Sequence, residues 1–173
     1  MRIVETAVIG MPPPALTLTL DDEADTARLA QALAASPLLS HCTLSLSGGL
    51  GAGKTTFTRH LLRALGAQGR IKSPTYALVE PYEGLPSPHG RLDAWHFDFY
   101  RLQDPNELPE SGLLEHFAQP GLKLVEWRSQ AGASAPPVDL ELHWTIDADG
   151  LRRHVSLRAE STIGQQLLEA CPT

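Results

Sequence analysis

Residues Cys42–Leu65 read CTLSLSGGLGAGKTTFTRHLLRAL, and this stretch decides the fold. It begins with alternating apolar residues, passes through a cluster of glycines, and continues with helical spacing at Phe57, Leu61, Leu62 and Leu65. Alternation is typical of a strand, and a spacing of three to four residues is typical of a helix. The stretch therefore predicts a strand, a glycine-rich loop and a helix, in that order.

The loop matches the phosphate-loop pattern G-x-x-x-x-G-K-[ST] at Gly48, Gly53, Lys54 and Thr55. Glycines let the backbone turn its N–H groups inward toward an anion, and the helix that follows directs the positive end of its dipole at the same point. Lys54 supplies a charge for the outer phosphates, and the Thr55 hydroxyl can ligate Mg²⁺. We expect a bound nucleoside triphosphate to contact Gly49, Leu50, Gly51, Ala52, Gly53, Lys54, Thr55 and Thr56.

Length and composition set the class of protein. A chain of 173 residues with 42% hydrophobic and 20% charged residues is typical of one soluble globular domain. The net charge of −6 argues against broad nucleic-acid binding, which depends on Lys and Arg neutralising phosphates. Any connection with RNA would therefore go through a partner.

The two cysteines, Cys42 and Cys171, provide neither a disulfide framework nor a metal-ligand spacing. We expect a reduced, cytoplasmic setting. No apolar run approaches the length that spans a bilayer, and the N-terminus lacks the features of a signal peptide, so we expect no membrane association.

The N-terminal part divides into an extension and the start of the domain. Residues 1–14 include MPPPAL, whose prolines cannot join a helix or a central strand, and we expect a flexible extension followed by a single domain over 15–173. Leu16–Leu20 alternates like a strand. Acidic residues follow it, including Glu23, at the start of a predicted amphipathic helix. On their own they are best interpreted as helix caps.

Past the loop's own helix, Ser73 and Thr75 flank a proline that forbids helix, so both hydroxyls lie on an extended segment. The position is that of a nucleotide-responsive switch, although hydroxyls beside proline are also common turn formers. Glu80–Leu92 contains Gly84, Pro86, Pro88 and Gly90, and we expect a loop there that forms a long hairpin connection on the surface.

Two later segments place acidic residues on predicted strands. Along Asp93–Tyr100, alternation turns His96 and Asp98 to the side opposite the aromatic residues, either toward solvent or toward a magnesium ion. Leu122–Trp127 is an apolar strand that ends in Glu126, the slot in which phosphate-loop proteins keep a carboxylate for the metal or the attacking water. Glu126 fits that role better than Asp98, and both can serve.

The C-terminal half predicts a helix over Asn106–Phe117, a β-hairpin formed by Val138–Ile146 and Leu151–Leu157, and a short helix over Thr162–Glu169. No internal repeat or second domain is evident. The fold class is therefore α/β, a P-loop NTPase-like central sheet flanked by helices with a C-terminal β-hairpin.

Four segments in this order, GGLGAGKTT, IKSPTYALVEPY, HFDFYRL and LVEW, resemble the TsaE family, over roughly residues 16–157. The resemblance implies a P-loop ATPase that binds MgATP and ADP and hydrolyses ATP weakly. In that family the activity supports the TsaD and TsaB proteins, which transfer a threonylcarbamoyl group to adenosine in the anticodon loop of tRNAs that read ANN codons. The tRNA would be contacted only indirectly, through the complex.

The resemblance also implies roles for individual residues. Lys54 would cradle the phosphates, with Lys54, Asp98 and Glu126 as the catalytic group, and Thr55, Asp98 and Glu126 would surround Mg²⁺. Ser73 and Thr75 would belong to the nucleotide-responsive segment, beside Trp127.

The start of the first helix and the hairpin turn would also reach the nucleotide. Glu23 and Thr26 become candidate contacts near the base, and Gly150 would close the pocket from the other side. Two departures from the family matter. Gly49 replaces the Asp that is common in the family, and the N-terminal extension has no counterpart.

Other classes remain open. A small-molecule or nucleotide kinase shares the loop, but it needs an acceptor pocket and usually an arginine-bearing lid, and only Arg101 and Arg128 are candidates outside the loop's own helix. A GTP switch is weaker, because no Asn-Lys-x-Asp element occurs. A nucleotide-gated binding module, in which hydrolysis is incidental, is the third alternative.

Overall fold

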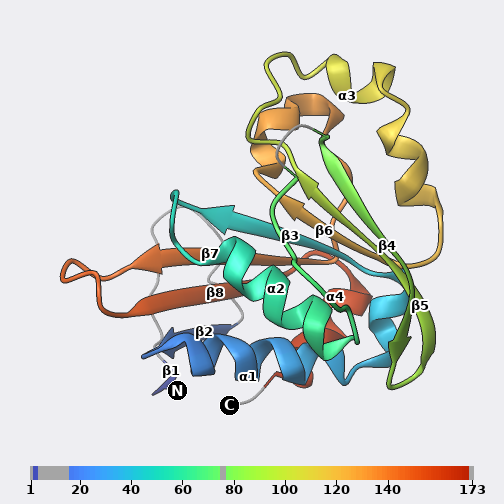
Figure 1. Cartoon of the computed structure of the whole chain (residues 1–173). Helices are drawn as coiled ribbons and strands as arrows, with labels where there is room; N and C mark the ends of the chain where they lie inside the picture. Colours follow the sequence, from blue (N-terminus) through green and yellow to red (C-terminus); the bar gives the residue numbers. More distant parts are fainter. Residues whose placement is uncertain (1, 4–15, 75–76, 172–173) are drawn as a thin grey trace.

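The computed structural model describes residues 2–3, 16–74 and 77–171. Within these residues, eight strands form one sheet in the order β1-β2-β8-β7-β3-β6-β5-β4. The strands are β1 (Arg2–Ile3), β2 (Leu16–Leu20), β3 (Thr43–Gly48), β4 (Val79–Ser87), β5 (Gly90–Asp98), β6 (Leu122–Glu126), β7 (Leu140–Ile146) and β8 (Arg153–Ala159). Strands β7, β3, β6 and β5 run parallel, and the outer strands are antiparallel (Figure 1).

Helices cover both faces of the sheet. On one face, α1 and α2 lie side by side, whereas α3 and the short 3₁₀ turns η2 and η3 gather at the end of the sheet formed by β4, β5 and β6 (Figure 1). The helical elements are α1 (Glu23–Ala34), η1 (Pro37–His41), α2 (Lys54–Ala64), α3 (Glu107–Glu110), η2 (Leu113–Ala118), η3 (Arg128–Ser134) and α4 (Thr162–Glu169). Among the described residues, no helix is long and apolar enough to cross a bilayer.

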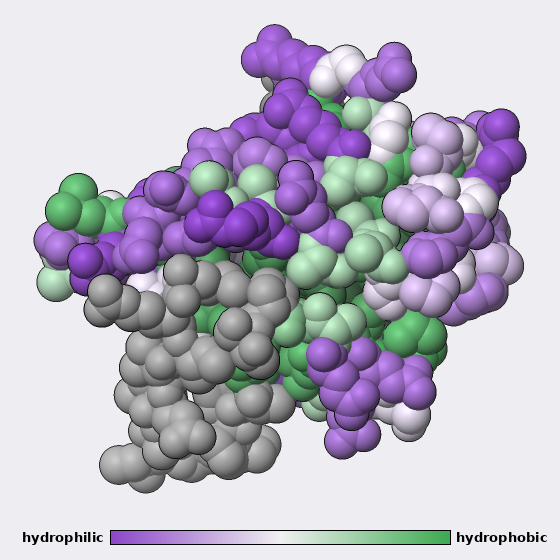
Figure 2. Space-filling model, turned by 90° about the horizontal axis from the view of Figure 1, so that it is seen from below, coloured by the Kyte–Doolittle hydropathy of each residue, from purple (hydrophilic) through white to green (hydrophobic). Residues whose placement is uncertain are grey.

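Two apolar clusters hold these layers together. The larger cluster joins α1 and α2 to the sheet and includes Leu33, Phe57 and Leu46, none of which is exposed. The smaller cluster packs Phe97 of β5 against Leu108 of α3 on the opposite face. Each such fully buried side chain contributes about 1.5–3 kcal/mol, so α2 is held firmly behind β3. The molecule seen from below mixes hydrophobic and hydrophilic residues, with hydrophobic ones near the middle (Figure 2).

The α/β class, the flanked central sheet and the C-terminal hairpin are confirmed. The strand at Leu16–Leu20 and the helix at Thr162–Glu169 have the predicted bounds. Within the predicted extension, Arg2–Ile3 pairs with β2 as β1, and residues 4–15 lie outside the described part of the chain. The division at residue 14 stays a prediction.

The hairpin expected over Glu80–Leu92 is present, but the long loop predicted within it is wrong. This segment is mostly strand: β4 and β5 form a hairpin with only residues 88–89 between them, and a bulge lies between Tyr82 and Leu85. Pro81 and Pro86 fit within β4 because it is the edge strand, where a missing N–H on the open side breaks no pairing. The prolines therefore mark an edge and not a loop.

The single helix predicted over Asn106–Phe117 is also wrong. The chain forms the four-residue α3 and then the 3₁₀ turn η2, separated at Gly112, whose φ is +74°. Pro109 has no N–H to continue a helical ladder, and the left-handed glycine ends it.

Candidate functional site

The glycine loop is built as the sequence predicts, between the end of β3 at Gly48 and the start of α2 at Lys54. Gly48 has φ +130°, and a Cβ placed there would lie 2.4 Å from the backbone oxygen of Trp144 on β7. Gly53 has φ +119°, which L side chains rarely adopt. The loop therefore requires glycine at both ends, and it is pressed against β7.

Lys54 extends back under its own loop. Its Nζ donates to the backbone oxygens of Gly48 and Gly49, each at 2.8 Å, and lies 4.3 Å from the centre of the Trp127 ring. Burial lowers the pKa of Lys54, and the negative charges of Glu126 and Asp98 oppose that shift. A buried cation thus faces two carboxylates from later strands.

Thr55 and Glu126 are in direct contact. The Thr55 hydroxyl lies 2.9 Å from Glu126 Oε1 and 3.1 Å from Oε2, and the Glu126 residue is 2% exposed. A carboxylate only accepts hydrogen bonds, so Thr55 donates its proton and keeps its oxygen lone pairs available for a cation. This pairing joins the first turn of α2 to the end of β6.

Asp98 lies beside Glu126, because the two residues are register partners on the parallel strands β5 and β6. Asp98 Oδ1 accepts the backbone N–H of Tyr100 at 3.0 Å, and Oδ2 accepts the hydroxyl of Ser73. Ser73 is thus in contact with Asp98, while its role in a nucleotide-responsive segment stays a prediction. Thr75 lies outside the described residues.

Trp127 closes one side of the site. It is the single non-glycine residue with positive φ, +58°, among the described residues, and this turn directly after β6 brings its ring over Lys54. Left-handed geometry costs a non-glycine residue roughly 1–2 kcal/mol. The Tyr100 ring packs on it with centroids 5.0 Å apart.

Glu23, the first residue of α1, and the hairpin turn each contact a neighbouring element. Asp22 caps α1 by accepting the N–H of Asp25, as expected for a helix cap, and Glu23 Oε1 lies 2.9 Å from His60 Nε2 on α2. Arg152, beside the turn that contains Gly150, pairs with Asp21 at 3.0 Å. Contacts therefore connect Glu23 to α2 and the hairpin to α1, while nucleotide contact by Glu23, Thr26 or Gly150 stays a prediction.

Sequence reasoning left one residue out of the site. His96 is fully buried, and its Nε2 lies 3.0 Å from Glu126 Oε1. The signal was present, since alternation along β5 puts His96 on the same side as Asp98. That side faces α2 and the loop, so the solvent-facing alternative is wrong.

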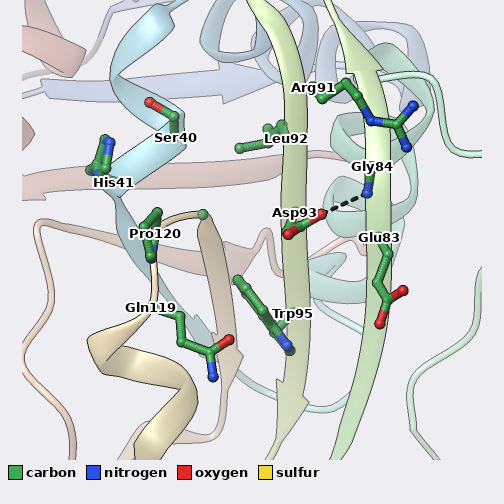
Figure 3. Close-up of a pocket in the computed structure, with 11 residues that line it drawn as sticks. Ser40, His41, Glu83, Gly84, Arg91, Leu92, Asp93, Trp95, Gln119 and Pro120 are labelled. Atoms are coloured by element: carbon green, nitrogen blue, oxygen red, sulfur yellow. Dashed lines mark hydrogen bonds between the residues drawn. The ribbon is translucent and has the colours of Figure 1, made fainter.

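The described residues contain no group of three or more His, Cys, Asp and Glu side chains arranged to hold a metal ion alone. A hollow of about 610 Å³ lies away from the glycine loop, between η1, β4, β5 and the segment just before β6 (Figure 3). There Asp93 Oδ1 accepts the backbone N–H of Gly84. A hollow of about 420 Å³ adjoins the loop and is lined in part by Gly49, Trp127 and His143.

The sequence also matches a protein-family model. The family model described as threonylcarbamoyl adenosine biosynthesis protein TsaE matches residues 20–155. The chain belongs to the TsaE family.

Individual relatives agree with this membership of the TsaE family. The tRNA threonylcarbamoyladenosine biosynthesis protein TsaE of Haemophilus influenzae is 39% identical over 125 residues, which are 72% of this chain and 75% of that protein. The TsaE of Rickettsia typhi is 32% identical over 144 residues, or 83% and 94% of the two chains. The crystal structure of Bacillus subtilis YdiB matches with a TM-score of 0.69 and 26% identity, covering 89% of this chain and 91% of that one. These findings confirm the family resemblance and the fold class.

Proposed function

We propose that this TsaE-family chain binds MgATP and ADP at the glycine loop, hydrolyses ATP slowly, and supports TsaD and TsaB in forming threonylcarbamoyladenosine in tRNA. The observation that carries the proposal is the contact between Thr55 and the buried Glu126, directly beside Lys54. A hydroxyl, a carboxylate and an ammonium group beside a glycine loop are the groups that phosphoryl transfer uses, and their proximity supports the proposal.

The residues present fit a magnesium nucleotide. Gly48 and Gly53 hold the loop in a shape that side chains would strain, and Lys54 is charged and donates only to neutral carbonyls in the contacts described above. Phosphate oxygens are stronger acceptors for an ammonium than carbonyls are. Thr55, Asp98 and Glu126 would hold Mg²⁺, which when bound neutralises charge on the phosphates.

TsaD and TsaB are proposed from the family, and two features of this chain support a protein partner: exposed apolar side chains and a negative net charge. Among the described residues, four large hydrophobic side chains are exposed: Leu50, Tyr100, Ile146 and Leu151. Leu50 is in the glycine loop, Tyr100 follows the end of β5, Ile146 ends β7, and Leu151 precedes β8 in the hairpin. All four therefore lie toward the loop end of the sheet. Exposed apolar side chains at one end of the sheet support a protein partner, and the net charge of −6 disfavours direct tRNA binding.

Hydrolysis and partner dependence test the proposal together. We expect slow ATP hydrolysis by the chain alone and a changed rate when TsaD and TsaB are added. Thr55→Ala and Glu126→Ala should impair hydrolysis more than nucleotide binding, because the metal and its ligands act mainly on charge that develops during phosphoryl transfer.

Matched variants make this test specific. Thr55→Ser keeps the hydroxyl and should retain most of the activity, and Glu110→Ala removes an exposed carboxylate on α3 and should have no effect. Equal losses of binding and hydrolysis in Thr55→Ala would contradict the assignment. ATP consumption in proportion to an added small-molecule acceptor would favour the kinase alternative.

A further inference from the structure

His96 is fully buried on β5, the strand next to the edge strand β4, yet it is polar. It lies on β5 between β4 and β6, in register with Glu80 and Leu124, and none of its surface is exposed. Its Nε2 lies 3.0 Å from Glu126 Oε1. Because a carboxylate only accepts, Nε2 carries the hydrogen and donates it.

The second ring nitrogen makes the choice of histidine costly. Among the described residues, Nδ1 of His96 is buried without a hydrogen-bond partner. An unsatisfied buried polar atom destabilises a protein by about 1–3 kcal/mol, and an apolar side chain at this position would avoid that cost. Core packing therefore does not account for histidine here, whereas the bond to Glu126 does.

Two donors from different elements fix the Glu126 carboxylate. His96 approaches Oε1 from the sheet, and the Thr55 hydroxyl approaches both oxygens from α2, at 2.9 and 3.1 Å. Oε1 is contacted by both donors and Oε2 by Thr55 alone, so the carboxylate has little freedom to rotate. The orientation of Glu126 relative to Thr55 thus depends on His96.

We propose that His96 is a positioning residue for magnesium: it holds Glu126 in the orientation that, with Thr55, receives the cation of a bound nucleotide. The inference rests on the proposed function, which assigns Mg²⁺ to Thr55, Asp98 and Glu126. His96 itself touches neither phosphate nor metal in this account. Donors that orient metal-binding side chains typically change metal affinity by 10–100-fold when removed.

A pair of amide variants separates positioning from packing. In His96→Gln the side-chain amide nitrogen reaches about as far as Nε2 does, so it can still donate to Glu126. In His96→Asn the amide reaches only about as far as Nδ1. Both variants keep a polar, uncharged side chain of smaller volume than histidine, and thermal unfolding checks that both are folded.

The measurement is the affinity for ADP by calorimetric titration, once with excess Mg²⁺ and once with a chelator. For the wild-type chain we expect Mg²⁺ to tighten ADP binding. His96→Asn should lose about tenfold or more of that magnesium-dependent gain, His96→Gln should retain most of it, and metal-free ADP affinity should stay within about twofold in both.

Several outcomes overturn the inference while leaving the proposed function intact. One is a full magnesium-dependent gain in His96→Asn, and another is an equal loss of affinity with and without Mg²⁺, which indicates a structural role. If His96→Asn does not fold, a tenfold loss of the magnesium-dependent gain in folded His96→Gln also overturns the inference. If Mg²⁺ does not tighten ADP binding by the wild-type chain, the proposed function fails, and the inference fails with it.

Discussion

Two buried lysines at opposite ends of the parallel strands have the same kinds of direct partner, two backbone carbonyls and a tryptophan ring. Lys54 donates to the carbonyls of Gly48 and Gly49 and lies over the Trp127 ring. Lys123 donates to the carbonyls of Gln119 and Gly121 and lies over the Trp95 ring, 5.3 Å from its centre. Burial lowers the pKa of both lysines.

The charged groups and the chain elements near the two ammonium groups differ. Lys54 begins α2 after a glycine loop and faces Glu126 and Asp98, whereas the carboxylate that acts on Lys123 is that of Asp139. Two of the residues that contact the Lys123 ammonium, Trp95 and Gly121, also line the hollow of about 610 Å³ (Figure 3). A buried lysine on carbonyls and a tryptophan is therefore a structural device, and a phosphate site requires in addition the loop, the helix start and the carboxylates.

The largest expected effect is on nucleotide binding. Lys54→Ala should weaken ATP binding by at least about a hundredfold, because charge-assisted hydrogen bonds contribute about 1.5–3 kcal/mol each and 1.4 kcal/mol is tenfold in affinity. Lys123→Ala should leave affinity unchanged. Calorimetric titration of both variants measures the difference, and equal affinities would erase the distinction between the two ends.

Stability should show the reverse order. Lys123→Met keeps an apolar chain under Trp95 but leaves the carbonyls of Gln119 and Gly121 without this donor, so we expect it to lower the free energy of unfolding by about 1–3 kcal/mol. Denaturant unfolding, with nucleotide binding as the control, measures it. An unfolding midpoint equal to that of the wild type would mean that Lys123 has no structural role.

A third charged group sharpens the comparison at the loop end. Asp25 in α1 is buried, which raises its pKa. The hydrogen bond from the Asp21 N–H and the ion pair with Arg28 lower the pKa by more, so the net pKa lies below 3.8. A lowered folded pKa stabilises the protein above pH 3.8, and that contribution is lost as the pH falls through the folded value.

Asp25→Asn should therefore be less stable than the wild type by about 1 kcal/mol at pH 7, a loss typical of one hydrogen bond. The difference should shrink as the pH falls below 3.8. Thermal unfolding across this range, with Asn106→Asp as an exposed control, tests the sign. A gap that widens toward acid would contradict it.

The smallest effect concerns the thiols. Cys42, whose carbonyl accepts the Lys123 N–H, and Cys171 are both buried, and burial raises the pKa of Cys171 to about 11 and that of Cys42 further. Since the thiolate is the reactive form, we expect the folded protein to react slowly with a disulfide reagent at pH 8 and the unfolded protein to react rapidly. Rapid reaction of the native chain would show that one end opens readily.

Local pattern predicted the elements whose environment is local. The alternation in Leu16–Leu20 and the glycine cluster after Leu46 were sufficient for the strand, the loop and α2, and Glu126 was recognised from its place at a strand end. The strands within Glu80–Leu92 were missed because prolines are compatible with strands only at a sheet edge, and strand order is not local information. His96 was left out because its role depends on a side chain 30 residues away.

The central claim is that the loop before α2 binds a magnesium nucleotide between Lys54 and the Thr55–Glu126 pair. A crystal structure of the chain grown with MgADP tests it most directly. We expect the phosphates against the loop, Lys54 Nζ bonded to a phosphate oxygen, and Mg²⁺ within ligand distance of the Thr55 hydroxyl. A loop that stays empty at saturating MgADP, with Lys54 still on the carbonyls of Gly48 and Gly49, would contradict it.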